Sequence, residues 1–546
     1  MLTLVSPTIA RTQATDSSDL TRTISANEEQ NRSTKRPVCQ GELERGRLRV
    51  TEGMGNLTRR TAAGLASTTT AMVLTAVFQL IYTVVMARLL TPSEFGLIAM
   101  ANVAIGFTGR VSQFGVGPAL IQQPRIDDTT IRSATSLAWL FGAVGTAIVI
   151  ALSPVAGWFF DERAVVPVLM ALAVSISMVA ISLVPEALLR RGLRFRSLAT
   201  IDVVSFAVGY LGVGITAARM GAGVWSLVAA TLSQSVIRTL AIILVERRGL
   251  RLGWSRHAVR RIASFGSQVT AIGVVNNVTA TLPTMFIGRV LGSGLLGQFG
   301  RADMLIRLPI ERLTSTVSRV LFPALATVNL EPKRFLAGYS IAIAVAAAMI
   351  LPASSLTALL AAPLVAVVLG PGWEQAASVL PLLAATVALG YLTHFAGVTL
   401  EALGRLRAKL VSEVAVGALL LAGMAVFVRR GLVWAVAVLV VAEMLRFSLQ
   451  FAILAQAMRE RVTVVLRPLR VGFLLALATI IAVLPVRYLS ANWPAIVSIS
   501  AGVGASAVSL VAVRLLPPVA ELERELRQRY RLARLSSAEP TAPSSD

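Results

Sequence analysis

The sequence predicts an all-α membrane protein that crosses the bilayer about fourteen times. Three observations predict this fold class: 55% of the 546 residues are hydrophobic, only 14% are charged, and the mean hydropathy is +0.73. Soluble domains carry roughly 25% charged residues, so this chain has too little polar surface to cover a globule in water. It must therefore present apolar side chains to lipid.

The first element is a polar N-terminal stretch, residues 1–58, which is rich in Ser, Thr, Arg and Glu. It lacks both apolar periodicity and the apolar core of a signal peptide, which predicts a disordered cytoplasmic tail. Met54 precedes a basic pair and the first apolar run, so either Met1 or Met54 is the start of the native protein. N-terminal sequencing decides between them.

From residue 62 to 515, runs of roughly 20 apolar residues alternate with short polar breaks, and such a run is long enough to cross the hydrocarbon core as a helix. The span at 295–326 is the least hydrophobic of the set. A charged helical segment, 520–534, follows the last span. The predicted spans are about 63–89, 96–121, 132–156, 164–189, 197–217, 222–245, 262–289, 295–326, 335–359, 374–402, 407–428, 431–456, 465–488 and 493–515.

Loop charge predicts the orientation of these spans. The breaks after even-numbered spans carry 21 Lys and Arg residues, whereas those after odd-numbered spans carry 7. The positive-inside rule then places the even-numbered loops and both termini in the cytoplasm. Indole rings favour the membrane interface, and five tryptophans fall at predicted outer boundaries, which agrees with this orientation. They are Trp158, Trp225, Trp373, Trp434 and Trp493.

An internal repeat predicts how the spans are grouped. Arg88-Leu89-Leu90 and Arg289-Val290-Leu291 both begin the pattern R-[LV]-L-x5-G, 201 residues and six spans apart. Because six is even, both units have the same orientation, which predicts two six-helix lobes related by an axis along the membrane normal. The predicted parts are an N-lobe at 59–250, a C-lobe at 251–460, two further spans at 461–516 and a cytoplasmic tail at 517–546.

Composition also excludes several classes of function. The formal net charge is +23, but the basic residues lie in short clusters between apolar runs, so we expect no nucleic-acid partner. The single cysteine, Cys39, and two distant histidines, His257 and His394, offer no disulfide framework and no metal site. No catalytic constellation and no cofactor motif stand out, so we expect a protein that is not an enzyme.

Four motifs carry a resemblance to a known family. They are ARLLTPSEFG (87–96), ALLRRGLRFRS (187–197), IGRVLGSGLLGQFGRADMLIRLPIERLTSTVSRVLFPALA (287–326) and LGPGW (369–373). Residues 55–515 resemble the polysaccharide transporter branch of the multidrug/oligosaccharidyl-lipid/polysaccharide (MOP) flippase superfamily, which includes O-antigen and colanic-acid flippases.

The resemblance implies a bacterial inner-membrane protein that moves undecaprenyl-pyrophosphate-linked oligosaccharide from the inner to the outer leaflet. It also implies two six-helix lobes around a central cavity, with polysaccharide polymerase and export machinery as further partners beside the lipid-linked oligosaccharide and membrane lipids. One departure concerns ion coupling. Relatives often carry an acidic residue late in the seventh helix, where this chain has Asn276 and Asn277.

Candidate substrate-binding residues follow from the cost of ionisable groups in lipid. Arg301, Arg312 and Arg319 fall within about 20° of one face of the eighth span, at roughly 16 and 10 Å intervals, and form a ladder for phosphate groups. The alternative is an interfacial helix whose arginines extend to lipid headgroups. Arg110 lies 201 positions before residue 311, so each lobe places an arginine near mid-depth. Arg110 either binds substrate or pairs with a carbonyl or carboxylate group.

The remaining polar residues within spans are candidates for pairing and gating. Asn276 and Asn277 either line the cavity or hydrogen-bond between helices. Spacing of four residues predicts ion pairs on one face of the eighth span, and neighbouring spans 5 and 6 offer a further pair. These residues are Asp303, Arg307 and Glu311, and Asp202 with Arg238.

Two rival functions remain at this point. A multidrug or cation antiporter of the same superfamily requires an acidic cavity rather than one that carries arginines. A membrane polysaccharide polymerase or ligase requires a long outer loop with catalytic groups, and the longest predicted outer break is only about 15 residues.

Overall fold

A chain in lipid has no water to satisfy its peptide groups, so spanning segments form helices in which these groups bond to one another. The computed structural model describes residues 70–113, 115–123, 126–326, 332–489 and 493–514, and all regular secondary structure in these ranges is helical. They belong to one compact unit that begins at Thr68. The all-α fold class is confirmed. The predicted tails at 1–58 and 517–546 lie outside the described residues.

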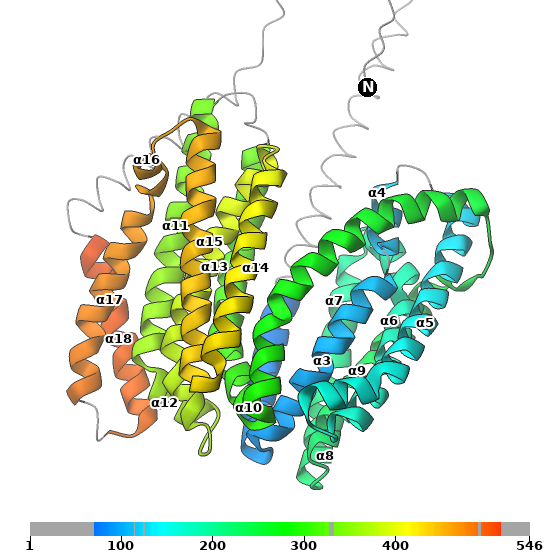
Figure 1. Ribbon diagram of the computed structural model, residues 1–546, viewed down its shortest axis with the longest axis horizontal. Coiled ribbons are helices and arrows are strands. Elements are labelled where there is room, and N and C mark those ends of the chain that lie inside the picture. Colours follow the sequence, from blue (N-terminus) through cyan, green and yellow to red (C-terminus); the bar gives the residue numbers. More distant parts are fainter. Residues whose placement is uncertain (1–69, 114, 124–125, 327–331, 490–492, 515–546) are drawn as a thin grey trace, which may run out of the picture. The chain divides into compact units, whose positions relative to one another are not determined.

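The helices follow the predicted apolar runs closely (Figure 1). The first described helix is Thr70–Leu89. It is followed by α3 (Pro92–Gln113), α4 (Val116–Gln122), α5 (Asp128–Phe160), α6 (Val165–Arg191), α7 (Phe195–Phe206), η1 (Ala207–Gly214), α8 (Ile215–Arg219), α9 (Val224–Val245), η2 (Arg248–Leu250), α10 (Arg256–Ala326), α11 (Pro332–Leu359), α12 (Ala361–Val368), α13 (Glu374–Ala402), α14 (Leu406–Phe427), η3 (Val428–Arg430), α15 (Leu432–Met458), α16 (Val462–Leu466), α17 (Leu469–Leu489) and α18 (Ala495–Arg514).

Eleven helices of the described part are long and apolar enough to cross a membrane, so the protein is a multi-pass membrane protein. Their boundaries run from Thr70 to Ala512. The other predicted spans, 96–121, 262–289 and 295–326, fall on α3 with α4 and on the two halves of α10. These segments are helical where the sequence predicts a span, and the count of fourteen stays a prediction.

Packing divides the helices into two groups, with α10 in contact with both. Helix α6 packs against both α5 and α9 to form one group. Helices α11, α13 and α15 form a second group that α17 joins through α11. Helix α10 packs most extensively against α3 and also contacts α11 and α13 (Figure 1). One buried apolar cluster runs through all of these contacts, from Met86 and Met100 through Ile306 to Leu383.

Helix α10 contains two helical halves that meet at Gly292, where φ is +83° and ψ is 177°. A positive φ of this size is readily adopted by glycine, because it has no β-carbon to clash with its own backbone. This position corresponds to the break that the sequence predicts between the seventh and eighth spans. The chain therefore turns here without a loop between the two halves.

Four of the five tryptophans assigned to an outer boundary are well exposed on the protein surface, as an interfacial position requires. The prediction of an interfacial ring was wrong for Trp373, whose side chain is only 1% exposed. Its indole is enclosed between helices, where its N–H donates to the carbonyl oxygen of Ala87.

Candidate transport site

The first copy of the repeated motif forms a corner between Thr70–Leu89 and α3. Thr91 is the N-cap of α3, and Glu94 accepts hydrogen bonds from the Thr91 backbone N (2.7 Å) and Oγ1 (2.9 Å). The bond from the Thr91 backbone N to Glu94 is one half of a capping box, and Pro92 occupies the first helical position, where its missing N–H has no bond to lose. The sequence TPSE therefore fixes the direction in which α3 leaves the corner.

The second copy of the motif forms the Gly292 corner, and the two corners contact each other. A β-carbon on Gly96 would overlap the carbonyl oxygen of Ser293, and one on Gly297 would overlap the carbonyl oxygen of Pro92. Pro92 and Ser293 are counterparts in the repeat, as are Gly96 and Gly297, because both pairs are 201 positions apart. The contact is thus reciprocal, as between two subunits related by a two-fold axis. We call these four residues the corner contact.

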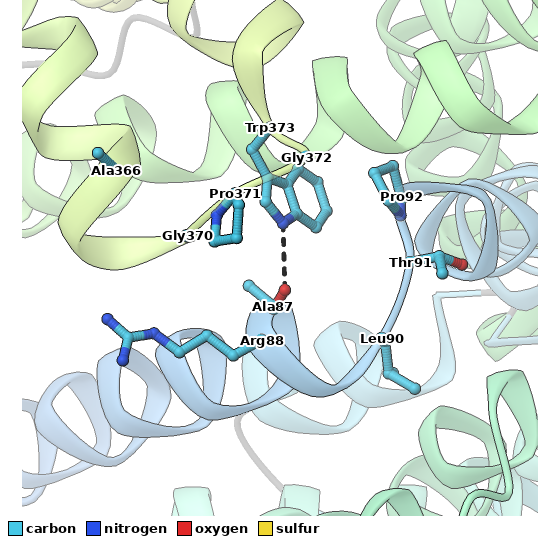
Figure 2. A pocket seen from close by; sticks show the side chains of 10 residues that line it. All are labelled: Ala87, Arg88, Leu90, Thr91, Pro92, Ala366, Gly370, Pro371, Gly372 and Trp373. Atoms are coloured by element: carbon cyan, nitrogen blue, oxygen red, sulfur yellow. Dashed lines mark hydrogen bonds between the residues drawn. The ribbon is translucent and has the colours of Figure 1, made fainter.

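The LGPGW segment, which precedes α13 in the second group of helices, packs against the first corner. Trp373 donates a hydrogen bond from Nε1 to the carbonyl oxygen of Ala87 (3.1 Å), which lies in the helix before the corner (Figure 2). Its ring also lies 5.6 Å from that of Phe95, between centroids. Burial of the indole satisfies its N–H and removes a large apolar surface from lipid, which explains why Trp373 is not interfacial.

Three further hydrogen bonds join the two corners to the LGPGW segment and to the residues beside it. Gln298, one residue after the corner contact, donates to the carbonyl oxygen of Gly372 (2.6 Å) and accepts from the backbone N of Ala376 (3.0 Å). Arg88 donates to the carbonyl oxygen of Val367 (2.8 Å). Beside these bonds lies a cavity of about 610 Å³, which Figure 2 shows from close by. It is lined by residues of the first corner and of the LGPGW segment.

Arg301 lies one helical turn beyond the corner contact, on α10, and is largely buried. Its guanidinium lies 4.1 Å from the ring centroid of Phe95, and its Nη1 lies 3.2 Å from Sδ of Met304. Within the described residues, no carboxylate pairs with it. An aromatic ring offsets part of the cost of a desolvated cation, so Arg301 is a largely buried positive charge that retains hydrogen-bond donors for an anion.

An aromatic group lies near this arginine. Tyr82 lies 4.9 Å from Tyr210 and 6.4 Å from Phe206, between ring centroids, and Phe206 stacks on Tyr210 at 4.6 Å. Tyr210 belongs to the π-helical turn η1, a deviation that is frequent at functional sites. The hydroxyl of Tyr82 is buried and has no hydrogen-bond partner in the described part of the chain. A buried donor without a partner is costly, and a bound ligand would satisfy it.

The next charged residues of α10 behave differently. Arg307 forms a bidentate ion pair with Asp303 on the preceding turn, with N–O distances of 2.8 and 2.9 Å. The spacing of four residues predicts this pair. The side chain of Glu311 is exposed, and among the described residues it forms no ion pair with Arg307.

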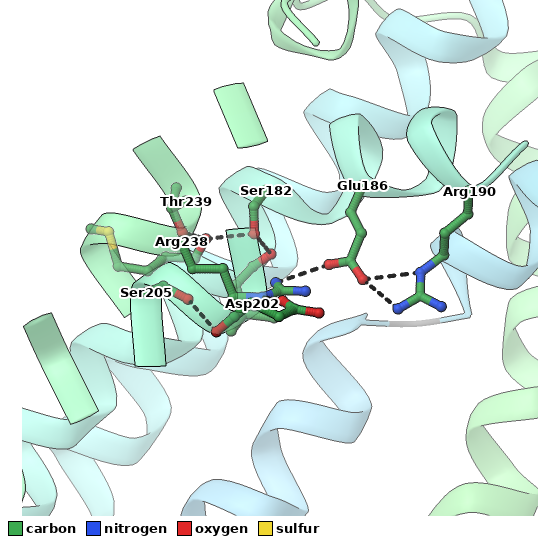
Figure 3. Close-up of polar contacts among 9 residues, drawn as sticks. Ser182, Glu186, Arg190, Asp202, Ser205, Arg238 and Thr239 are labelled. Carbon is green, nitrogen blue, oxygen red and sulfur yellow. Dashed lines mark hydrogen bonds and ion pairs between the residues drawn. The ribbon is translucent and has the colours of Figure 1, made fainter. Parts of the chain in front are cut away.

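Arg238 and Asp202, on α9 and α7, are joined by an ion pair of 2.8 Å. Arg238 also bonds to Glu186 on α6 (3.0 Å), and Glu186 in turn pairs with Arg190 (2.7 Å), as Figure 3 shows. The network connects three helices of one group. Sequence reasoning missed Glu186, although its spacing of four from Arg190 and its place within an apolar span were available as signals.

A second network connects α14 and α15. Arg446 pairs with Glu443 on its own helix and with Glu413 on α14 (3.3 Å), and Gln450 donates to Glu413 (2.9 Å). The sequence indicates only the local pair of Glu443 and Arg446. Glu413 joins them because α14 and α15 pack side by side, which spacing along one helix cannot reveal.

The other candidates fall where side chains are not described. The side chains of these residues lie outside the described part of the structure, although their backbones are helical: Arg110 on α3, and Asn276, Asn277, Arg312 and Arg319 on α10. Arg301 is thus the one member of the predicted arginine ladder whose surroundings the structure describes.

Comparison with known proteins identifies related chains. The lipopolysaccharide biosynthesis protein WzxC of Escherichia coli K12 is 25% identical over 337 residues, which cover 60% of this chain and 67% of WzxC. The teichuronic acid biosynthesis protein TuaB of Bacillus subtilis 168 is 25% identical over 384 residues, which cover 68% of this chain and 77% of TuaB.

A solved structure of the lipid II flippase MurJ, in an inward closed conformation, has the same fold. The TM-score is 0.65 at 11% sequence identity, and the match covers 82% of this chain and 98% of MurJ. Residues 85–378, more than half of the chain, match the family described as "Polysaccharide biosynthesis protein". This match includes both corners and the LGPGW segment, and the chain therefore belongs to that family of polysaccharide biosynthesis proteins.

Proposed function

We propose that this protein is a flippase that moves lipid-linked oligosaccharide, with an undecaprenyl-pyrophosphate carrier, from the inner to the outer leaflet of the bacterial cytoplasmic membrane. The relatives act in the biosynthesis of lipopolysaccharide and teichuronic acid, according to their names, and MurJ is named as a flippase for lipid II. A flippase moves its substrate without changing it chemically, so under this proposal the chain is a transporter and not an enzyme.

The observation that carries the substrate class is the largely buried guanidinium of Arg301. It has no carboxylate partner in the described residues, and Tyr82 adds a hydroxyl without a partner in the same aromatic neighbourhood. A pyrophosphate supplies acceptors for both groups, and guanidinium binds phosphate oxygens bidentately. Arg110, Arg312 and Arg319 extend this path under the same proposal, with Asn276 and Asn277 as polar lining.

Transport by alternating access gives the corner contact a role as a gate. The positive-inside rule places both corners on the outer face, so the reciprocal contact closes that face in the state described here. The bonds of Trp373 and Gln298 add to the closure. Opening toward the outside then requires the corners to separate, as the N-lobe (59–250) and C-lobe (251–460) rock against each other about the axis of the repeat.

The ion pairs have a supporting role in this scheme. The network of Asp202, Arg238 and Glu186 holds α6, α7 and α9 together so that the N-lobe moves as a body. Asp303 and Arg307 form a pair within α10, and Glu311 completes this set of gating candidates. Polysaccharide polymerase and export machinery are the protein partners to which the product would pass.

A multidrug antiporter is the alternative, and one observation favours it. Glu413 and Glu443 share a single arginine within the second helix group, which leaves an excess negative charge there. A cationic drug requires such a charge in the cavity, whereas the charge near the corner contact is positive. Resistance to cationic dyes in cells that overproduce the protein, with unchanged polysaccharide, would favour this alternative.

The decisive experiment is deletion of the gene followed by analysis of lipid-linked intermediates in spheroplasts. Loss of a flippase leaves the substrate on the cytoplasmic leaflet, where a membrane-impermeant glycosidase or lectin cannot reach it until the membrane is permeabilised. Accumulation on the outer leaflet would instead identify the missing step as polymerisation or ligation. Normal polysaccharide and no accumulated intermediate would contradict the proposal.

A further inference from the structure

The segment between α9 and α10 presents a positively charged and partly apolar surface. Arg247, Arg248, Arg251 and Arg256 are exposed, and Leu252 and Trp254 between them are 56% and 59% exposed. The neighbouring Glu246 is already engaged, because it accepts a hydrogen bond from the backbone N of Arg248 and lies 4.0 Å from Arg194. We call the four exposed arginines, Leu252 and Trp254 together the α9–α10 surface.

This surface is held in place rather than formed by a loose loop. Three backbone positions on its inner side are bonded to α5: the carbonyl oxygen of Gly249 accepts from Thr135 (3.0 Å), and Gly253 exchanges bonds with Ser136 (2.8 and 3.0 Å). The backbone N of Ser255 donates to Ser133 (3.0 Å). Because alternate residues are fixed inward, the side chains of Leu252 and Trp254 remain on the exposed side.

The position of the surface matches that of a lipid headgroup layer. It follows the last turn of α9 and precedes the first turn of α10, so it begins where two helices leave the apolar core. A tryptophan favours this interface, because its ring is apolar and its N–H is polar. Four arginines next to it match the clusters of basic residues that bind anionic lipids beside membrane helices. A small anion in water would contact the arginines but would make no apolar contact with Leu252 and Trp254.

We propose that the α9–α10 surface binds the phosphate headgroup of anionic phospholipids, with Leu252 and Trp254 inserted at the level of the headgroups. The bound lipid is a ligand separate from the transported substrate, and this proposal does not depend on the proposed transport function. Because the surface leads directly into the first turn of α10, a bound lipid would fix the cytoplasmic start of the helix that carries the Gly292 corner.

The test is native mass spectrometry of the purified full-length protein with added phosphatidylglycerol or phosphatidylcholine. We expect phosphatidylglycerol to bind more tightly, and the double variant Arg248→Gln/Arg251→Gln to lose about tenfold in that affinity, since each basic residue near an anionic surface contributes measurably. The matched control is Arg429→Gln/Arg430→Gln, which removes two exposed arginines beside another exposed tryptophan, Trp434.

Three outcomes would overturn the proposal. The first is equal loss of affinity in the two double variants, because binding would then follow net charge alone. The second is equal binding of the two lipids by the wild-type protein. The third is complete displacement of phosphatidylglycerol by millimolar inorganic pyrophosphate, which would assign the surface to the substrate's phosphates. A reduced affinity in Trp254→Ala, with the arginines intact, would support the interfacial position independently.

Discussion

Substitution of Gly96 by alanine tests whether the corner contact is a gate. The new β-carbon would overlap the carbonyl oxygen of Ser293, and real β-carbons essentially never approach a heavy atom closer than 3.0 Å. Both contacting groups are backbone, so no side chain can rotate away. Either the corners separate by more than an ångström or the closed state is strained by about 2 kcal/mol, which is roughly a thirtyfold change in the ratio of closed to open protein.

Thiol labelling measures this ratio. Met100 is fully buried and lies four residues after Gly96, so it shares the face of α3 that the corner contact covers. Cys39 is the only cysteine of the sequence, and Cys39→Ser therefore provides a background in which Met100→Cys is the single reactive site. We expect Gly96→Ala to raise the rate of labelling by an impermeant maleimide, added from outside, by up to roughly thirtyfold.

Two comparisons make the result specific. Gly300→Ala is the matched control, because a β-carbon there meets nothing within 4 Å. Gly297→Ala disrupts the corner contact from the other side, because its β-carbon would overlap the carbonyl oxygen of Pro92. The double variant Gly96→Ala/Gly297→Ala should therefore be labelled little faster than either single variant, as expected for coupled positions. Equal labelling rates in Gly96→Ala and Gly300→Ala would refute the gate.

Three further predictions follow from the same structure. Arg301→Gln should abolish most export of polysaccharide, and Arg301→Lys should retain part of it because the charge remains; surface polysaccharide is measured at matched protein levels, and normal export in Arg301→Gln would remove this residue from the substrate path. Trp373→Phe should weaken the closed gate by about 1 kcal/mol, the value of one hydrogen bond, and raise labelling at residue 100 about fivefold, whereas an unchanged rate would show that the bond to Ala87 does not contribute to closure. Arg238→Ala leaves Glu186 and Asp202 without their shared cation and should lower the thermal unfolding midpoint in detergent by several degrees, at a cost of about 1–3 kcal/mol; the exposed Arg190→Ala should cost less than about 1 kcal/mol, and equal effects would contradict a bracing role for Arg238.

Hydropathy was sufficient to predict the helical fold and most span positions, because lipid requires about 20 apolar residues for each crossing. It did not predict that the second and eighth spans, despite their charged residues, pack extensively against each other as α3 and α10. The position of Trp373 shows the same limit. Sequence places an aromatic residue near a boundary, but only packing against Ala87 and Phe95 decides that the ring is buried.

The site was predictable to the extent that it depends on spacing along one helix. The Asp303–Arg307 pair follows from the helical period, and the repeat indicated two equivalent corners. That the two corners touch each other was not predictable, because a contact between segments 201 residues apart depends on how the helices associate. The spacing of Glu186 from Arg190 was visible in the sequence, but its contact with Arg238 likewise depends on how the helices associate.

The reciprocal glycine contact has a consequence for how such a transporter can evolve to carry a different substrate. At the corner contact itself, two carbonyl oxygens approach two glycines that lack β-carbons, so this contact does not depend on the shape of any side chain. Side chains along the path can therefore be replaced to suit a different glycan without altering this backbone contact. A duplicated backbone joint of this kind separates the evolution of specificity from the evolution of motion.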